Sequence, residues 1–197
     1  AYSPSFDALA EAPNPKVKGK IVFIDHKMQP TQDGSGYGYY GRGRFTGPNV
    51  AAKKGAIAIV IRSIGTDAHR NPHTGVTNFE AGVKPIPAGA ISNPDADLLA
   101  RQWKRAVPVT QPQPLRLKLV LTPQNLGKRR SGNVIAEVPG SDPGASPVIV
   151  ACHLDSWDLG TGAIDDASGC GIITAAAKHV MKAEAPRRTI RILWAGA

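Results

Sequence analysis

A polar loop and a helix-like run between two apolar runs set the strongest limit on how this chain can fold. The first apolar run, PVIVAC at residues 147–152, and the second, TIRILWAG at 189–196, both read as buried strands. The run CGIITAAAKHVMKAE between them is typical of a helix. A strand, a helix and a strand at this spacing form a crossover, so we expect the two strands to be a parallel pair in an α/β sheet.

The rest of the chain also alternates between short apolar runs and helix-like segments. The expected strands cover residues 19–27, 56–63, 84–92, 114–122 and 131–140. A short helix is expected to start with Asn49 as its N-cap and to end at Gly55, and a longer one to cover 93–106. The proline-rich stretch from 107 to 114 predicts a boundary between two domains, 1–113 and 114–197.

Residues 34–47 are rich in glycine and include GYGYYG, which matches the G-x-G-x-x-G pattern of dinucleotide-binding loops. The match starts well after the preceding strand, and no helix is expected at its third glycine. About 20 residues further on, where an acidic residue should bind the ribose, the sequence is AIAIVI. We therefore reject dinucleotide binding and predict a mobile glycine-rich loop.

The formal net charge is +9, from 24 basic and 15 acidic residues, which raises the question of nucleic-acid binding. The basic residues are scattered, however, and no aromatic platform interleaves with their densest clusters. No apolar run approaches the length of a membrane helix. We therefore expect neither a nucleic acid nor a membrane as a partner.

The two cysteines, Cys152 and Cys170, flank the polar loop in apolar surroundings. They form neither a disulfide framework nor a CxxC zinc pair, so we interpret both as small core residues. Because neighbours on a strand point to opposite faces, Cys152 and His153 are not expected to share a metal ion.

The polar loop, HLDSWDLGTGAIDDASG at 153–169, begins at the carboxyl end of its strand, where open α/β sheets bind ligands. His153 and Asp155 are two residues apart, so they point to the same side of an extended strand. The glycines of the loop allow Asp165 and Asp166 to return toward His153. Two interpretations follow: a metal site with nitrogen and oxygen ligands, such as zinc, or a turn in which Asp165 or Asp166 caps the next helix.

The loop resembles the zinc-ligand segment of the aminopeptidase and glutamate-carboxypeptidase family of two-zinc exopeptidases, in which H-x-D is followed after about ten residues by G-x-x-D-D/N-x-S-G. The resemblance implies that His153 binds one zinc ion and that Asp165 bridges two. It implies that Asp155 supports His153, which makes Asp155 the catalytic candidate of the chain. It also implies a cis peptide bond after Asp165.

The resemblance extends upstream to AAKKGAIAIVIRS, PHTG and KPIPAGAI, which look like the protease-associated domain of the carboxypeptidase Q branch of this family. The fold it implies is a β-rich protease-associated domain with short helices at 1–113, followed at 114–197 by the first part of an α/β zinc-peptidase domain with a mixed sheet. His69 and His73 lie in a polar loop of the first domain. We read them as ordinary loop residues, with contact to substrate as the alternative.

The function implied by the resemblance is that of a hydrolase, a metallopeptidase with aminopeptidase or carboxypeptidase activity that cleaves terminal peptide bonds of peptides or dipeptides. In this family a strand like TIRILWAGA runs into a Glu-Glu pair, so we expect the chain to be a fragment that stops before the general base and several zinc ligands. The fragment is expected to be inactive and to bind zinc weakly or not at all. The parent is expected to be secreted or periplasmic, and homodimeric.

A different class of function stays open. The chain is alternatively a non-catalytic module for protein interaction, with a degenerate peptidase fold. The intact H-x-D and G-A-I-D-D elements favour the enzyme.

Overall fold

The computed structural model describes residues 1–73, 75–106, 115–124, 126–157 and 160–196. The chain divides into two compact units, Ala1–Gln124 and Asn125–Ala197. The expected domain boundary between 113 and 114 falls in the stretch 107–114, which lies outside the described residues, so it stays a prediction.

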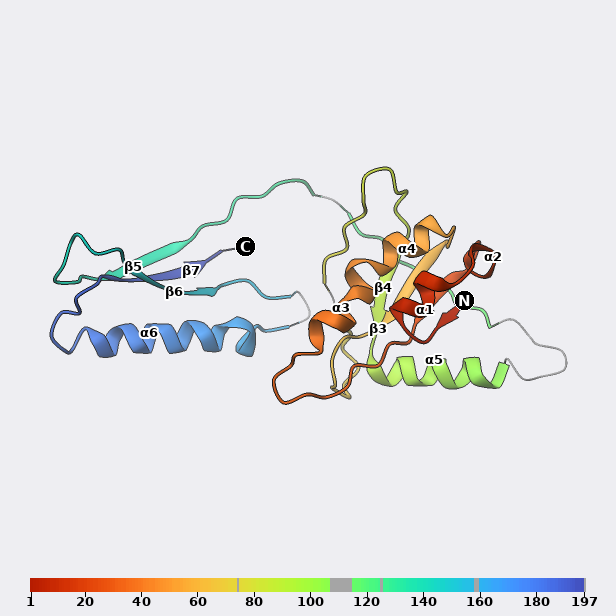
Figure 1. Ribbon diagram of the computed structural model, residues 1–197, viewed down its shortest axis with the longest axis horizontal. Coiled ribbons are helices and arrows are strands. Elements are labelled where there is room, and N and C mark those ends of the chain that lie inside the picture. The colour runs from red at the N-terminus through yellow and green to blue at the C-terminus, as the bar shows by residue number, and fades with distance from the viewer. Residues whose placement is uncertain (74, 107–114, 125, 158–159, 197) are drawn as a thin grey trace. The chain divides into compact units, whose positions relative to one another are not determined.

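The first unit is built on a parallel sheet of four strands in the order β1-β2-β3-β4 (Figure 1). These strands are β1 (Tyr2–Ser3), β2 (Ile21–Ile24), β3 (Ala58–Arg62) and β4 (Ala88–Ile91). The last three confirm the strands expected in the first half of the chain. Their register places Ile24 beside Ile61, and Ile61 beside Ala90, so all three strands end at the same edge of the sheet.

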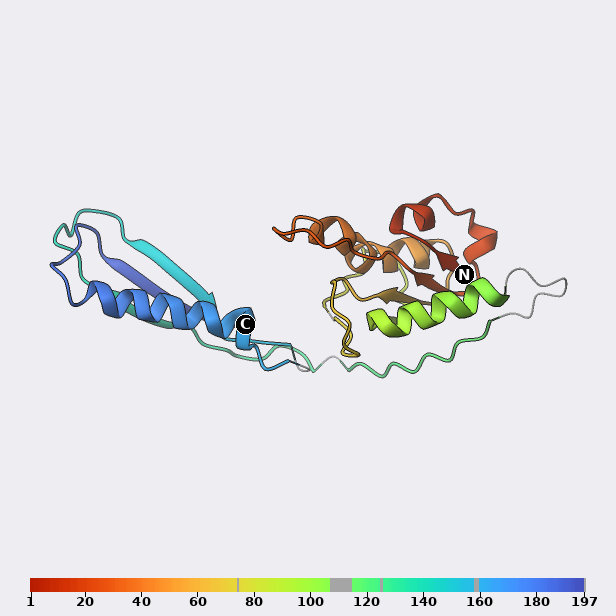
Figure 2. The same cartoon turned by 90° about the horizontal axis from the view of Figure 1, so that it is seen from below.

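Helices cover both faces of this sheet (Figures 1 and 2). On one face lie α1 (Phe6–Glu11), α2 (Asn14–Val17), α3 (Tyr37–Phe45) and α4 (Gly47–Lys53), and on the other lies α5 (Asn93–Ala106). The alternation of strand side chains divides the core accordingly. Ile24 and Ile59 pack with the first group of helices, whereas Phe23 and Val60 pack against Ala96 of α5.

The α/β class is confirmed, and α5 covers the residues expected of it. The expectation of a β-rich first domain is wrong, because the described helices of this unit hold more residues than its four strands. The assignment of the unit as a protease-associated domain stays a prediction.

The glycine-rich segment is largely the helix α3, so the prediction of a mobile loop is wrong. Gly41 and Gly43 are buried, and a Cβ atom at Gly43 would lie 3.8 Å from Ile24. The helix therefore approaches β2 with its glycine side, while the Arg42 guanidinium stacks at 4.5 Å on the ring of Phe6 in α1. Tertiary packing thus outweighs the low helix propensity of glycine.

The helix after this segment also differs in its start. It begins at Gly47, and Asn49 is a buried residue inside it rather than its N-cap. The Asn49 side chain instead donates to the carbonyl of Asn78 at 2.8 Å and accepts from the backbone N–H of Glu80 at 2.8 Å. Asn49 therefore fixes the loop that runs over α4.

The stretch 115–124 contains no strand, which corrects the strand expected at 114–122. Its leucines nevertheless occupy every second position from 115 to 121, as in a strand with one apolar face. Leu119 packs into the cluster around α5, and Leu121 lies 3.5 Å from the position that a Cβ atom of Gly89 would take. Leucine side chains of this segment therefore pack on the sheet, although its backbone does not pair with a strand edge.

The second unit is a three-stranded mixed sheet with one long helix. Its strands are β5 (Val134–Val138), β6 (Val148–His153) and β7 (Ile190–Ala195), in the order β5-β7-β6. The π-helical turn η1 (Ala163–Ser168) and α6 (Gly169–Val180) connect β6 to β7. β6 and β7 are parallel and β5 is antiparallel to β7, so the crossover and the mixed sheet are confirmed.

No helix among the described residues is both long enough and apolar enough to span a membrane.

Candidate metal site

The candidate site starts at the carboxyl end of β6. Strand alternation turns the buried Cys152 toward α6 and places His153 on the opposite side. His153 lies beside Ala195, the last residue of β7, and the backbone N–H of Leu154 donates to the carbonyl of Ala195 at 2.8 Å. Whatever follows β7 in the chain therefore starts next to this histidine.

The loop after β6 returns Asp165 to the same point. Its last tight turn needs a glycine at 162, where φ is +66° and a Cβ atom would lie 2.8 Å from that of Ser156. The peptide bond between Asp165 and Asp166 is cis, as the resemblance implied. Asp165 Oδ1 lies 2.9 Å from His153 Nε2. The predicted convergence of these two side chains is therefore present in the structure.

The second ring nitrogen of His153 is held by Asp155. Nδ1 lies 3.0 Å from the Asp155 carbonyl oxygen and 3.3 Å from its Oδ1. The two side chains thus lie on the same side, as their spacing predicted. A ring that donates Nδ1–H to Asp155 presents Nε2 toward Asp165, and such partners fix the tautomer of metal-binding histidines.

The carboxylate of Asp166, the residue after Asp165, has a different role. Asp166 Oδ2 accepts the backbone N–H of His153 at 3.2 Å, and the Asp166 carboxylate occupies the place that a side chain at Gly169 would need. α6 is preceded by Ser168, which makes no side-chain cap hydrogen bond, and Asp166 is the last residue with non-helical φ and ψ before this helical run. The interpretation that Asp165 or Asp166 caps the helix stays a prediction. Asp166 also ties the strand end to the helix start.

The surroundings of His153 favour the charged form of its ring. The hydrogen bond to the Asp155 carbonyl is the main cause that raises the pKa of His153; desolvation opposes it, and the Asp165 carboxylate adds to it. The side chains are accessible, with exposed fractions of 43% for His153 and 77% for Asp165. A metal ion could reach both donors from solvent.

Cys152 and Cys170 form a disulfide, so their interpretation as reduced core residues is wrong. Cys152 faces α6, and Cys170 is in the first turn of that helix, which packs on the same side of the sheet. The strand alternation and the expected helix already placed both residues between these elements. Sequence reasoning missed the bond because it counted cysteines without asking which face each one shares.

The described residues contain no group of three or more His, Cys, Asp or Glu side chains arranged to hold a metal ion. The site therefore offers two converging donors, His153 Nε2 and Asp165 Oδ1, with Asp155 behind the imidazole. Its position at the carboxyl end of a parallel strand, where the crossover to β7 begins, is that of a ligand site in an α/β enzyme domain.

Comparison with known proteins indicates the class of protein that this chain resembles. Residues 133–197, which hold the candidate site, match the family described as peptidase family M28. The chain is 42% identical to a peptidase M28 precursor of known crystal structure from Shewanella amazonensis, with a TM-score of 0.83. This similarity covers 100% of the present chain and 43% of the Shewanella chain.

The relatives compared by sequence are carboxypeptidase Q proteins. The chain is 34% identical over 192 residues to carboxypeptidase Q of Bos taurus and 36% identical over 183 residues to carboxypeptidase Q of Xenopus laevis. These matches cover 96% and 92% of this chain but only 38% and 36% of the relatives. The resemblance to M28 peptidases and to carboxypeptidase Q is thus confirmed, for a chain that spans less than half of their length.

Proposed function

We propose that this chain is a segment of a zinc-dependent exopeptidase in which His153 and Asp165 are metal ligands. The observation that carries the proposal is the 2.9 Å separation of His153 Nε2 and Asp165 Oδ1 at the carboxyl end of β6. The match of residues 133–197 to peptidase family M28 supports the reaction class, hydrolysis of a peptide bond.

The donor set fits zinc. Zinc takes imidazole nitrogen and carboxylate oxygen at about 2.0–2.2 Å in tetrahedral sites, so two ligands of one ion lie about 3.3–3.6 Å apart. The observed separation of 2.9 Å therefore requires little movement for both atoms to share an ion. Imidazole with carboxylate also suits zinc better than the all-oxygen sites of calcium or magnesium.

Each residue has a distinct role in this proposal. Asp155 accepts the Nδ1 proton and so keeps Nε2 of His153 available as a ligand, which makes Asp155 a positioning residue. Asp165 would hold zinc through the carboxylate oxygen near His153, and its second oxygen could serve a second ion. A zinc ion held there would lower the pKa of a water molecule to about 7 and would polarise a scissile carbonyl group. The substrate class we propose is a peptide or dipeptide.

The proposal includes donors that these residues do not supply. Catalytic zinc sites use three protein ligands and structural sites four, whereas the described residues bring two together. The family resemblance implies a Glu-Glu pair after the β7-like strand, and the register of Ala195 beside His153 supports that position for them. We therefore expect the 197-residue chain by itself to bind zinc weakly and to be inactive.

Isothermal titration of the 197-residue chain with zinc tests the ligand count. We expect a dissociation constant weaker than about 1 μM, because two protein donors hold zinc loosely. The weak binding should be lost in His153→Ala and Asp165→Asn and kept in His179→Ala, an exposed histidine elsewhere on α6. Submicromolar affinity, or equal binding by all three variants, contradicts the assignment.

The enzyme itself is tested in the longer protein. Zinc-dependent dipeptide hydrolysis should disappear in His153→Ala and persist in His179→Ala. If the longer protein binds no zinc and hydrolyses no dipeptide, the alternative of a non-catalytic interaction module is correct.

The disulfide supports an oxidising compartment. Disulfides persist in secreted, periplasmic and extracellular proteins and are rare in the cytosol. Since Cys152 and Cys170 are bonded to each other, we propose that the protein is secreted or periplasmic.

A further inference from the structure

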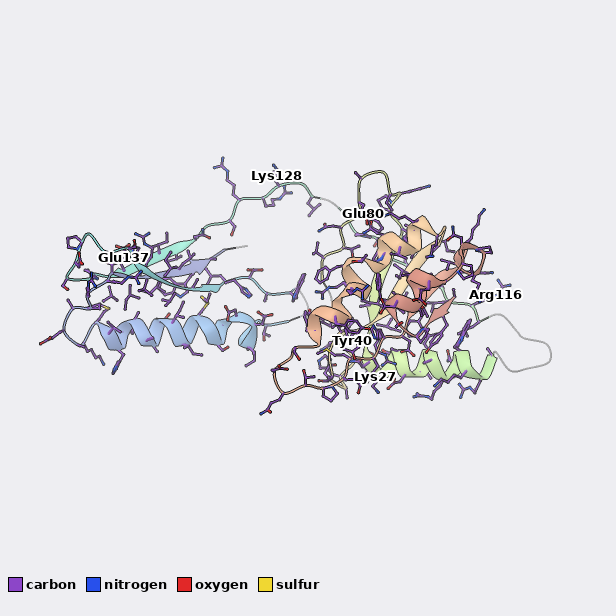
Figure 3. The ribbon with its side chains drawn as sticks, viewed as in Figure 1. Lys27, Tyr40, Glu80, Arg116, Lys128 and Glu137 are labelled. Atoms are coloured by element: carbon purple, nitrogen blue, oxygen red, sulfur yellow. A yellow bond between two sulfur atoms is a disulfide. The ribbon has the colours of Figure 1, made fainter. Side chains whose placement is uncertain are left out.

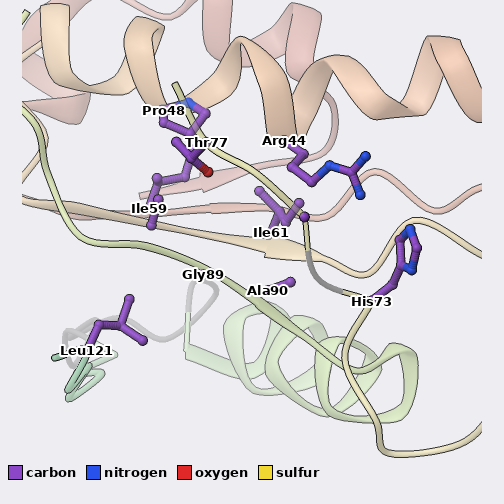
Figure 4. A pocket seen from close by; sticks show the side chains of 11 residues that line it. Arg44, Pro48, Ile59, Ile61, His73, Thr77, Gly89, Ala90 and Leu121 are labelled. Carbon is purple, nitrogen blue, oxygen red and sulfur yellow. The ribbon is translucent and has the colours of Figure 1, made fainter. Parts of the chain in front are cut away.

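The first unit contains a cavity of about 260 Å³ between its sheet and the helices α3 and α4 (Figure 4). Ile59 and Ile61 of β3 and Ala88 and Ala90 of β4 form its floor. The register pairs Ile59 with Ala88 and Ile61 with Ala90, so small residues on β4 stand beside large ones on β3. The space exists because β4 carries no large side chain on this face.

Arg44 brings a charge to one wall of this cavity. Its side chain comes from α3, and the residue is only 9% exposed. The guanidinium lies 4.5 Å from the centre of the Phe45 ring and 5.8 Å from that of Tyr37. These aromatic rings hold its plane in a fixed direction.

His73 is the second polar group of the cavity that is fixed in place. Its backbone N–H donates to Ser63 Oγ at 2.8 Å, and its Nε2 lies 2.6 Å from the hydroxyl oxygen of Tyr37. Figure 4 shows Arg44 and His73 at the same end of the cavity. Thr77 adds a hydroxyl group, and none of the lining residues that the structure describes is acidic.

We propose that this cavity binds a carboxylate that has a branched apolar chain and no ammonium group. The Arg44 guanidinium offers the fork of N–H donors that matches a carboxylate, and the isoleucine and alanine side chains surround an aliphatic group. The volume lies just under the roughly 300–1,000 Å³ of pockets for drug-sized ligands, so the ligand is small.

The lining charges decide between related ligands. A free amino acid would bring an ammonium group into a cavity whose described lining includes Arg44 and His73 but no carboxylate. An acylated amino acid, such as the last residue of a peptide, or a short branched fatty acid lacks this charge. Both carry the carboxylate and the apolar chain that the site recognises. The proposal does not depend on the metal site of the second unit.

NMR titration of the 197-residue chain distinguishes these ligands. We expect N-acetyl-L-leucine and 4-methylpentanoate to bind in the millimolar range or tighter and to shift the amide signals of Gly75 and Gly89, which line the cavity. L-leucine should bind at least about tenfold more weakly because its ammonium group is unpaired, and N-acetyl-L-leucinamide likewise because it lacks the carboxylate. Tighter binding of the acetylated compound than of the fatty acid identifies a peptide terminus as the natural source, and the reverse identifies a fatty acid.

Two matched variants test the role of Arg44. Arg44→Met should weaken binding of the better ligand at least about tenfold, whereas Arg42→Met should not, because Arg42 is on the same helix but pairs with Asp7 at 3.1 Å instead of lining the cavity. Ala90→Leu, which keeps Arg44 and fills the space, should also abolish binding if the chain keeps its circular dichroism spectrum. The proposal is wrong if neither carboxylate shifts Gly75 and Gly89, or if folded Arg44→Met or Ala90→Leu binds like the unmodified chain.

Discussion

Arg62, the last residue of β3, is a buried charge whose partners all come from neighbouring elements. Its Nη2 lies 2.6 Å from Asp25 Oδ1 and 2.7 Å from Asp97 Oδ1, and its Nη1 donates to the carbonyl of Asn93 at 3.1 Å. Tyr2 donates its hydroxyl to Asp25, and burial and this bond raise the pKa of Tyr2 to about 12, so the donor persists at neutral pH. One guanidinium thereby links β1, β2, β3 and α5.

Removing this guanidinium should strongly destabilise the first unit. We expect Arg62→Leu to lower the free energy of unfolding by about 3–5 kcal/mol, because the substitution leaves the largely buried Asp25 carboxyl group without its partner. Urea unfolding followed by the fluorescence of Trp103, which stacks on Tyr2, measures the change. Arg70→Leu is the matched control: its exposed pair with Asp95 at 3.2 Å should contribute under about 1 kcal/mol. Equal losses for the two variants would show that burial of the pair is not what matters.

At the residue scale, the contacts among the exposed motif residues could be predicted from the sequence, whereas the partners of the buried Arg62 could not. The proximity of His153, Asp155 and Asp165 was predictable because strand period and loop glycines restrict where those side chains can go. Arg62 was read only as the end of an apolar strand, AIAIVIRS. A signal existed in Asp25, which follows the neighbouring strand at the same sheet edge. To predict the Arg62–Asp25 pair from this signal, one needs the register between β2 and β3, which are far apart in the chain.

At the scale of elements, the disulfide joins the two parts that position the metal site. Cys152 precedes His153 on β6, and Cys170 is in the first turn of α6, directly after the turn that carries Asp165. The bond closes a loop with a sequence separation of 18, which contains the whole motif. It therefore limits how far His153 and Asp165 can separate when the chain fluctuates.

Loss of the disulfide should destabilise the second unit. We expect Cys152→Ala combined with Cys170→Ala to lower its free energy of unfolding by about 2–4 kcal/mol, since a loop of this length restricts the unfolded chain by about 3 kcal/mol. Urea unfolding of the double variant, compared with the oxidised and the reduced unmodified chain, gives the value. The reduced chain and the double variant should agree within about 1 kcal/mol. Two free thiols in the oxidised, denatured chain would instead show that the bond does not form.

Element existence was easier to predict than element boundaries and neighbours. Strand, helix and strand between 147 and 196 and the helix at 93–106 have strong apolar patterns, and the structure confirms them. α3 could not be predicted from GYGYYGRGRF because its stability comes from contacts with Ile24 and α1, which local sequence does not reveal. The segment at 115–121 has a strand pattern but finds its apolar partners by packing, so alternation alone did not decide its pairing.

At the scale of the whole molecule, the two units differ in how completely their sheets are covered. The first has helices on both faces, whereas the described helix α6 covers only one face of the second (Figure 1). On the opposite face, Ile135 of β5 and Ile149 of β6 are 60% and 59% exposed. Between them Arg191 pairs with Glu137 at 2.6 Å, and Glu137 can be located on β5 in Figure 3. This face is an apolar surface with one ion pair, the composition of an interface rather than of a solvated sheet.

This face should make the 197-residue chain self-associate as its concentration rises. The outer strands of the sheet, β5 and β6, also present backbone edges that can pair with another copy. Sedimentation velocity over a hundredfold concentration range should therefore show a shift from monomer to larger species. The dye ANS should bind to the monomer at low concentration.

A charge introduced on the exposed face of the sheet distinguishes association through this face from non-specific hydrophobic association. Ile149→Lys should shift self-association to at least about tenfold higher concentration, because a lysine within the contact must be desolvated. Ile172→Lys provides the comparison: Ile172 is 68% exposed on α6, so the same charge change there should leave association unaltered. If both substitutions weaken association equally, the association depends on overall surface hydrophobicity and not on this face. If the chain is a monomer at every concentration, the exposed face and the strand edges do not drive association.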